Sequence, residues 1–124
     1  FETNQIPKLH TIRRGKRWKK GNKIHFAVNN RSKDYFQFAP VTECTEVQDI
    51  VFEWIEEEGS KKVIIEIDGE MYGWAAIINE ELTYFTPKLT KLAVNDGFDT
   101  LRNFLDYFSE DFEGQIIHWT EKRY

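Results

Sequence analysis

The sequence of 124 residues has one cysteine, three prolines and no long hydrophobic run. A single thiol, Cys44, excludes an intramolecular disulfide and any zinc site built from several cysteines. We therefore expect a reducing, cytoplasmic setting. No apolar stretch approaches the roughly 18–20 residues that cross a bilayer, and no hydrophobic signal region follows the N-terminus, so we expect no membrane partner.

The chain has the length of one domain and carries ample material for a core. Hydrophobic residues make up 40% of it and aromatic residues 15%. We find no internal repeat, low-complexity tract or interdomain linker, so we predict a single domain over residues 1–124. The chain begins at Phe1 rather than Met, and we therefore treat the native N-terminus of this domain as incomplete.

Charge is divided between two unequal parts of the chain. Residues 1–33 contain ten Lys/Arg and one acid, a balance of +9, whereas residues 34–124 contain seven Lys/Arg and twenty Asp/Glu, a balance of −13. Such asymmetry indicates a basic surface that meets phosphates or another anionic partner. The alternative is a solvated basic loop opposed by the acidic part of the same protein, and charge counts do not separate the two.

Hydrophobic periodicity predicts antiparallel strands first and helices late in the chain. We expect strands over residues 10–14, 23–28, 41–54, 62–68, 70–74 and 115–120, with a bulge in the third and a hairpin turn at Asp68-Gly69. Thr86-Pro87 resembles a helix start, and apolar residues at 101, 104, 105 and 108 predict a second helix that Gly114 breaks. The economical architecture is α+β, a small, mostly antiparallel β-barrel with two or three short helices.

The segment from Lys8 to Phe26 concentrates basic residues together with an indole and two imidazoles. Cations beside exposed aromatic rings suit a single-stranded nucleic acid or an unstacked base. The candidate ligand-binding residues of this kind are Arg13, Arg17, Trp18, Lys19, Lys20 and His25. The three histidines show no spacing typical of metal ligands, so we expect no metal and no cofactor.

Lys8, Thr11 and Arg13 form a combination that suggests hydrolysis. A hydroxyl nucleophile, a nearby amine base and a cation for an oxyanion would make such a site. Thr11 and Arg13 point to one face of an extended segment, whereas Lys8 needs a bend to join them. The residues by themselves favour the alternative, in which Thr11 is an ordinary strand residue and both cations are solvated.

Four motifs, in order along the chain, resemble the ASCH domain family. They are K-x-H-T-I-R at 8–13, R-W-K-x-G-x-K-I-H-F at 17–26, L-A-x-x-D-G-F at 92–98 and I-I-H-W-T at 116–120. The resemblance covers most of the chain and implies a PUA-like β-barrel with a cleft lined by the Lys/Thr/Arg segment. Members of this superfamily are thought to act in RNA binding. A small bacterial branch consists of amidohydrolases that remove the acetyl group from N4-acetylcytidine.

The resemblance also implies residue roles. In the enzymatic branch a lysine, a threonine and a glutamate form the catalytic set, and these look like Lys8, Thr11 and a position near Asp96. Aspartate is one methylene shorter than glutamate, which counts against a simple transfer of activity. Asn95-Asp96-Gly97 can equally cap the preceding helix and turn the chain, so both interpretations of Asp96 stay open.

We therefore predict an ASCH-domain protein that binds RNA or a nucleotide-like anionic ligand in a basic cleft. Lys8, Thr11 and Arg13 would line its floor, with Asp96 opposite and the basic loop as its rim. One alternative is an amidohydrolase of the N4-acetylcytidine type, with Thr11 as nucleophile, Lys8 as base and Asp96 orienting or relaying protons. Another is a protein-interaction module that docks an acidic partner.

Overall fold

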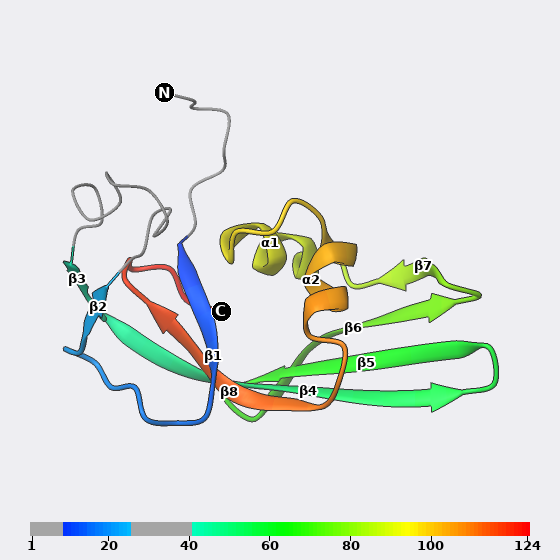
Figure 1. Ribbon diagram of the computed structural model, residues 1–124, viewed down its shortest axis with the longest axis horizontal. Helices are drawn as coiled ribbons and strands as arrows, with labels where there is room; N and C mark the ends of the chain where they lie inside the picture. The colour runs from blue at the N-terminus through cyan, green and yellow to red at the C-terminus, as the bar shows by residue number, and fades with distance from the viewer. Residues whose placement is uncertain (1–8, 26–40) are drawn as a thin grey trace, which may run out of the picture.

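The computed structural model describes residues 9–25 and 41–124, which form a six-stranded antiparallel sheet, a two-stranded ribbon and two short helices (Figure 1). The order of the large sheet is β1-β8-β4-β5-β6-β7. Its strands are β1 (His10–Arg14), β4 (Glu46–Glu57), β5 (Ser60–Ile67), β6 (Glu70–Ile78), β7 (Glu81–Phe85) and β8 (Phe112–His118). The ribbon pairs β2 (Lys23–His25) with β3 (Val41–Glu43), and the helices are α1 (Lys88–Asn95) and α2 (Leu101–Tyr107).

The expected α+β class and mostly antiparallel sheet are confirmed, but the sheet is not closed into a barrel. β1 and β7 are its two edges, and no pairing joins them within the described ranges. The helices lie over one face of the sheet, between β1 and β7 in the view of Figure 1. Leu89, Leu92 and Phe104 from these helices are fully buried in the main core. The helices therefore cover the apolar face that closure of the sheet would otherwise bury.

Local sequence signals account for several elements. Asp68 and Gly69 form the turn between β5 and β6 with φ of 54° and 84°, both positive, as a tight two-residue hairpin requires. Thr100 precedes α2, and its hydroxyl accepts the Asn103 backbone N–H at 3.1 Å. Both elements arise from residues close together in the sequence, which is why periodicity and turn chemistry predict them.

Other boundaries differ from the predictions. The strand expected over residues 41–54 is divided at 44–45, and β6 continues past Trp74 to Ile78. Thr86 does not cap α1 through its side chain, because its hydroxyl lies 3.1 and 3.2 Å from the Trp74 backbone N and O and bonds there instead. Gly114 lies inside β8 rather than ending a helix. A Cβ at this position would collide with the Arg13 carbonyl oxygen, so the close approach of β1 explains this glycine.

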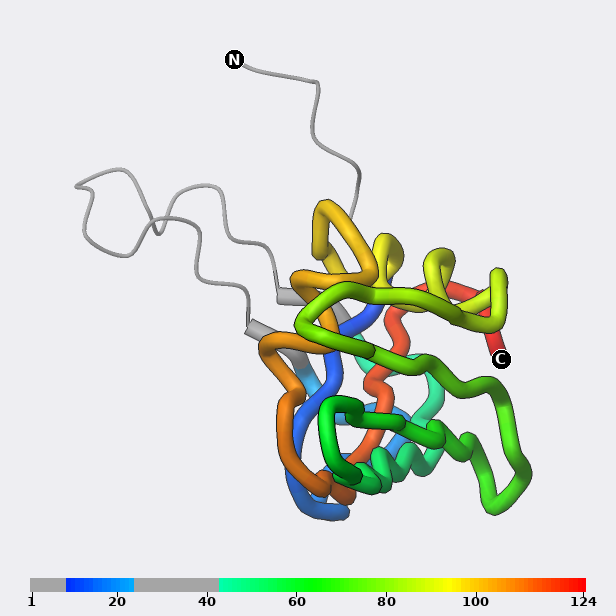
Figure 2. Tube along the Cα trace, turned by 90° about the vertical axis from the view of Figure 1, so that its right-hand side faces the viewer, coloured from blue at the N-terminus to red at the C-terminus, as the bar shows by residue number. Residues whose placement is uncertain are grey.

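The two faces of the sheet carry different clusters. Alternation along β1 turns His10 and Ile12 toward the helices and the main core, whereas Thr11 and Arg13 face the other side. A smaller cluster on that second side joins Cys44 and Ile117 to the half-buried Trp18, Val47 and Trp119. Figure 2 shows β1 and β8, from opposite ends of the chain, running side by side. β1 thus positions side chains on both faces and lies at an edge.

Candidate functional site

Three of the predicted site residues meet at the edge formed by β1. Thr11 is half-buried, Arg13 is exposed and Asp96 follows α1. All three line one pocket of about 470 Å³, whose other walls come from Ile12, Gly97, Phe98, Tyr107 and Phe108. Thr11, Arg13 and Asp96 thus line one pocket at this edge although more than 80 residues separate them in the chain, but the side chains of Thr11 and Arg13 belong to the face of the sheet turned away from the helices.

A second pocket of about 470 Å³ adjoins the first along β1. Both pockets share Ile12, Arg13, Tyr107 and Phe108. The second adds Arg14, Ser109, Glu110 and Phe112. We call the two together the β1 groove. Arg14 lies over the ring of Phe112 with its guanidinium carbon 4.8 Å from the ring centroid, which fixes this cation at the groove.

Asp96 has a structural role that is directly visible. It is the C-cap of α1, and its backbone N–H donates to the carbonyls of Leu92 and Ala93, both at 3.1 Å. Its side chain is 4% exposed, and Oδ1 lies 3.1 Å from Nδ1 of His10. The capping that the sequence allowed is thus present, and the carboxylate is also held against a buried imidazole beside the groove.

His10 links Asp96 to the last residue of the chain. Its Nε2 lies 2.8 Å from the Tyr124 hydroxyl, which also accepts the Asn95 side-chain N–H at 2.8 Å. With the His10 proton on Nδ1, each of these bonds has one donor and one acceptor. Burial raises the pKa of Tyr124 to about 12, so the phenol stays protonated and can donate to His10. This network anchors Asp96 and β1.

A second part of the network surrounds His118. Its Nε2 bonds to Oε1 of Gln48 at 2.9 Å, and the Tyr124 backbone N–H donates to the same oxygen at 3.0 Å. The other ring nitrogen, Nδ1, is buried and has no hydrogen-bond partner in the part of the chain that the structure describes. His118 is thus a fully buried strand residue with one hydrogen-bonded ring nitrogen.

Trp18 is fixed to the same face of the sheet as Arg13. Its backbone N–H donates to Oε1 of Gln115 at 2.9 Å, and Nε2 of Gln115 donates to the Trp18 carbonyl at 3.0 Å. Gln115 is 4% exposed and lies opposite Arg13 in the strand register. Trp18 also lines a pocket of about 320 Å³ with Arg17, Asn22 and Lys23. The rim residue Trp18 is therefore next to the proposed floor.

The other predicted residues have simpler positions. Arg17, Lys19 and Lys20 are exposed in the loop between β1 and β2. His25 is the last residue of β2, and only its backbone is described. Lys8, the proposed base, lies outside the described residues. A Lys8–Thr11 pair therefore lies outside the described part of the site.

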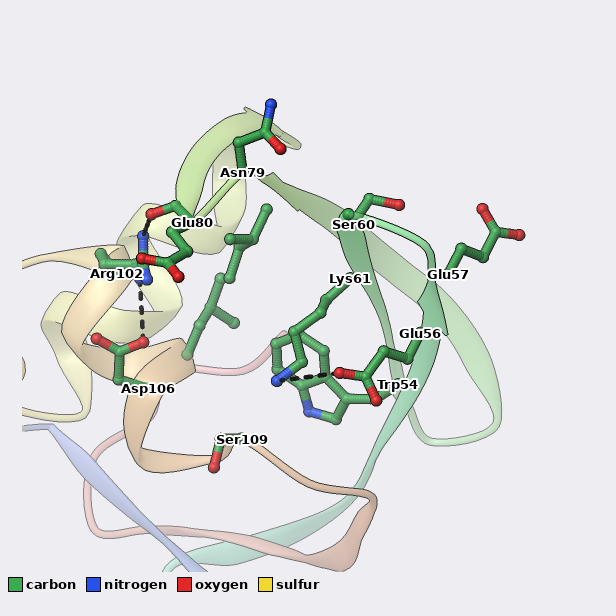
Figure 3. Close-up of a pocket in the computed structure, with 13 residues that line it drawn as sticks. Trp54, Glu56, Glu57, Ser60, Lys61, Asn79, Glu80, Arg102, Asp106 and Ser109 are labelled. Atoms are coloured by element: carbon green, nitrogen blue, oxygen red, sulfur yellow. Dashed lines mark hydrogen bonds and ion pairs between the residues drawn. The ribbon is translucent and has the colours of Figure 1, made fainter.

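A pocket of about 490 Å³ lies between the β4–β5 hairpin, the β6–β7 turn and α2 (Figure 3). Its cations are already engaged: Lys61 lies 4.0 Å from Glu56, and Arg102 lies 3.0 Å from Asp106. Arg102 also donates to the Glu80 carbonyl at 2.9 Å. Four carboxylates against two cations make this pocket unfavourable for an anion. The sequence did not predict it.

Cys44 and the histidines offer little catalytic chemistry. Cys44 is 1% exposed, its thiol donates to the Glu46 carbonyl at 3.4 Å, and burial raises its pKa, all of which oppose a thiolate nucleophile. No group of three or more His, Cys, Asp or Glu residues that could hold a metal ion occurs within residues 9–25 and 41–124. Over the same ranges, no helix has the length and apolar character to span a bilayer.

Tyr107 is the groove residue that the sequence reasoning missed. It is 71% exposed at the end of α2 and lines both pockets of the groove. Its helical position contained a usable signal, because it falls outside the apolar face formed by residues 101, 104, 105 and 108. The pairing of His10 with Tyr124 had no such local signal, since 114 positions separate them.

Comparisons with known proteins return no relative for this chain: no family model, no curated protein and no solved structure matches it. A functional assignment therefore depends on the chemistry of the site.

Proposed function

We propose that the chain is an ASCH-like protein of the PUA-like superfamily that binds RNA or a nucleotide-like anionic ligand at the β1 groove. The observation that carries this proposal is the position of Arg13, which is exposed, lines both pockets of the groove and forms no ion pair with a described residue. A guanidinium in this state can pair with a phosphate without first breaking an internal contact.

The surrounding charges support an anionic ligand at this end of the molecule. Arg14 is held at the groove by Phe112, and Arg17, Lys19 and Lys20 are exposed on the adjoining loop. Lys16 is less available, because its Nζ lies 3.4 Å from Asp49. Glu110 and Asp96 also line the groove, so the ligand's phosphates should lie on the arginine side of it.

Replacing Arg17, Lys19 and Lys20 together by alanine should weaken RNA binding and flatten its salt dependence. Each cation that neutralises a phosphate of a single strand contributes about 0.7 to the slope of log K against log [salt], so losing three should reduce the slope by about 2. The measurement is fluorescence anisotropy of a labelled RNA decamer over a salt series. Replacing the exposed Lys62, Lys88 and Lys91 removes the same charge elsewhere and should leave the slope unchanged. Salt-independent binding, or equal affinities for the two triple variants, would contradict the proposal.

An amidohydrolase acting on a modified nucleoside is the second candidate, because Thr11 and Asp96 both line one pocket at the β1 edge. In such a reaction the hydroxyl of Thr11 would attack the acetyl carbonyl, the amine would leave with a proton, and water would release acetate from the ester. Purified protein incubated with N4-acetylcytidine should then yield cytidine. Thr11→Ala should abolish turnover, whereas Thr90→Ala, an exposed change on α1, should not. Equal turnover in the Thr11→Ala variant would remove Thr11 from this role.

A further inference from the structure

Tyr107 presents an aromatic surface that the fold does not use. Its ring lies 4.9 Å from the ring of Phe108 and 5.6 Å from that of Phe98, at interplanar angles of 79° and 54°. These contacts orient the ring, yet the residue remains 71% exposed. Tyr107 is the most exposed of the large hydrophobic residues in the described ranges. An oriented, exposed ring beside arginines is suited to stacking on a planar group.

The opposite wall of the groove is the free edge of β1. The Gly15 N–H donates to the Glu113 carbonyl on β8, so alternation directs the amides of Arg13 and Thr11 toward β8 as well. The N–H and C=O groups of Ile12 therefore point away from β8. Ile12 is 7% exposed and lines both pockets. The β1 side of the groove therefore presents a backbone N–H donor and a C=O acceptor from Ile12.

These groups match an unpaired base better than a base pair. The face of a base can stack on Tyr107, its Watson–Crick edge can exchange hydrogen bonds with the Ile12 backbone, and its phosphate can reach Arg13. In a duplex both the faces and these edges are already occupied by other bases. Tyr107 and Arg13 are shared by the two pockets, which gives two compartments in succession.

We propose that the β1 groove takes two successive unpaired nucleotides of single-stranded RNA, with Tyr107 as the stacking residue between them. This inference rests on the proposed function and narrows it to single strands. It assigns a specificity role to a residue that carries no charge, so its contribution is separable from the electrostatic one.

The test is anisotropy with a labelled single-stranded RNA decamer and with the same sequence in a duplex, at one salt concentration. We expect the single strand to bind more tightly and Tyr107→Leu to weaken that binding roughly 5- to 100-fold, the effect of losing one stacked base. Tyr107→Phe should retain it, and the salt slope should not change. Tyr84→Leu removes a 45% exposed tyrosine on β7 and should have no effect.

Several results would overturn the inference. Equal binding of single strand and duplex with a normal salt slope would reject it and leave the proposed function intact, as would unchanged binding by Tyr107→Leu. No binding of either RNA at low salt would reject both. Displacement of bound RNA by an equal concentration of an acidic extended peptide would indicate strand addition at β1 instead.

Discussion

Alanine in place of Gly114 is expected to break the pairing of β1 with β8 and to remove the β1 groove with it. A Cβ at this position collides with the Arg13 carbonyl oxygen and lies 2.8 and 2.9 Å from two ring carbons of Phe112. The carbonyl belongs to a paired strand, and Phe112 is a core residue that makes edge-to-face contacts with Phe52 and Phe108. Neither obstacle can move without loss of packing, so the free energy of unfolding should fall by about 3 kcal/mol or more, the upper end of overpacking effects.

Urea unfolding followed by circular dichroism measures this loss, and Gly15→Ala provides the control. Gly15 also lies beside β1 but has open space around its missing Cβ and a φ of +90°. Its replacement should cost only the penalty for a left-handed residue, about 1–2 kcal/mol. If Gly114→Ala costs no more than Gly15→Ala, the close approach of β1 and β8 is wrong. Loss of RNA binding should accompany unfolding of β1 in the Gly114 variant.

Gly114 also illustrates which parts of the fold the sequence predicts. The limits of β1 and the Asp68-Gly69 hairpin follow from local alternation and turn chemistry, and both agree with the structure. The glycine was interpreted as a helix breaker because its actual constraint is a contact with Arg13, a residue distant in the sequence. β7 lacks the alternation of buried and exposed residues that predicts a strand, since its residues are mostly exposed. Long-range packing therefore explains Gly114, whereas β7 pairs with its neighbour β6 through a short turn.

The candidate site could also be predicted only in part. Thr11 and Arg13 stand out by their residue types and Asp96 by the motif resemblance, and only the fold shows that they line one pocket. The two hydrogen bonds between the Gln115 side chain and the Trp18 backbone depend on the register of β1 against β8. No spacing within the chain specifies this register. Tyr107 could have been found as an exposed helix residue, but its relevance arises only because it lines the same two pockets as Arg13.

Stability should decline in acid because of His118. Burial, followed by the proximity of His10 and Arg123, lowers the pKa of His118 from 6.5 to about 3, and Asp68 offsets this in part. Because the pKa of His118 is lower in the folded protein, the unfolded chain binds this proton more readily between about pH 3 and pH 6.5. The contribution of neutral His118 is therefore complete above about pH 6.5 and is lost as the pH falls toward 3, by about 1.4 kcal/mol per unit at most.

Comparison with His118→Gln isolates this effect, because glutamine keeps an N–H donor for Gln48 and does not titrate. Urea unfolding at pH 7 and pH 4 should show the wild-type protein losing about 3 kcal/mol more than the variant over this interval, whatever the variant's stability at pH 7. The carboxylates titrate in both proteins, so their contributions cancel in the difference between the two stabilities. An NMR titration gives an independent check, since the ring of His118 should remain unprotonated at pH 5. Parallel stability curves would contradict the prediction. Because the same network holds Tyr124, His10 and Asp96 beside the groove, acid should loosen the ligand site as the network is lost.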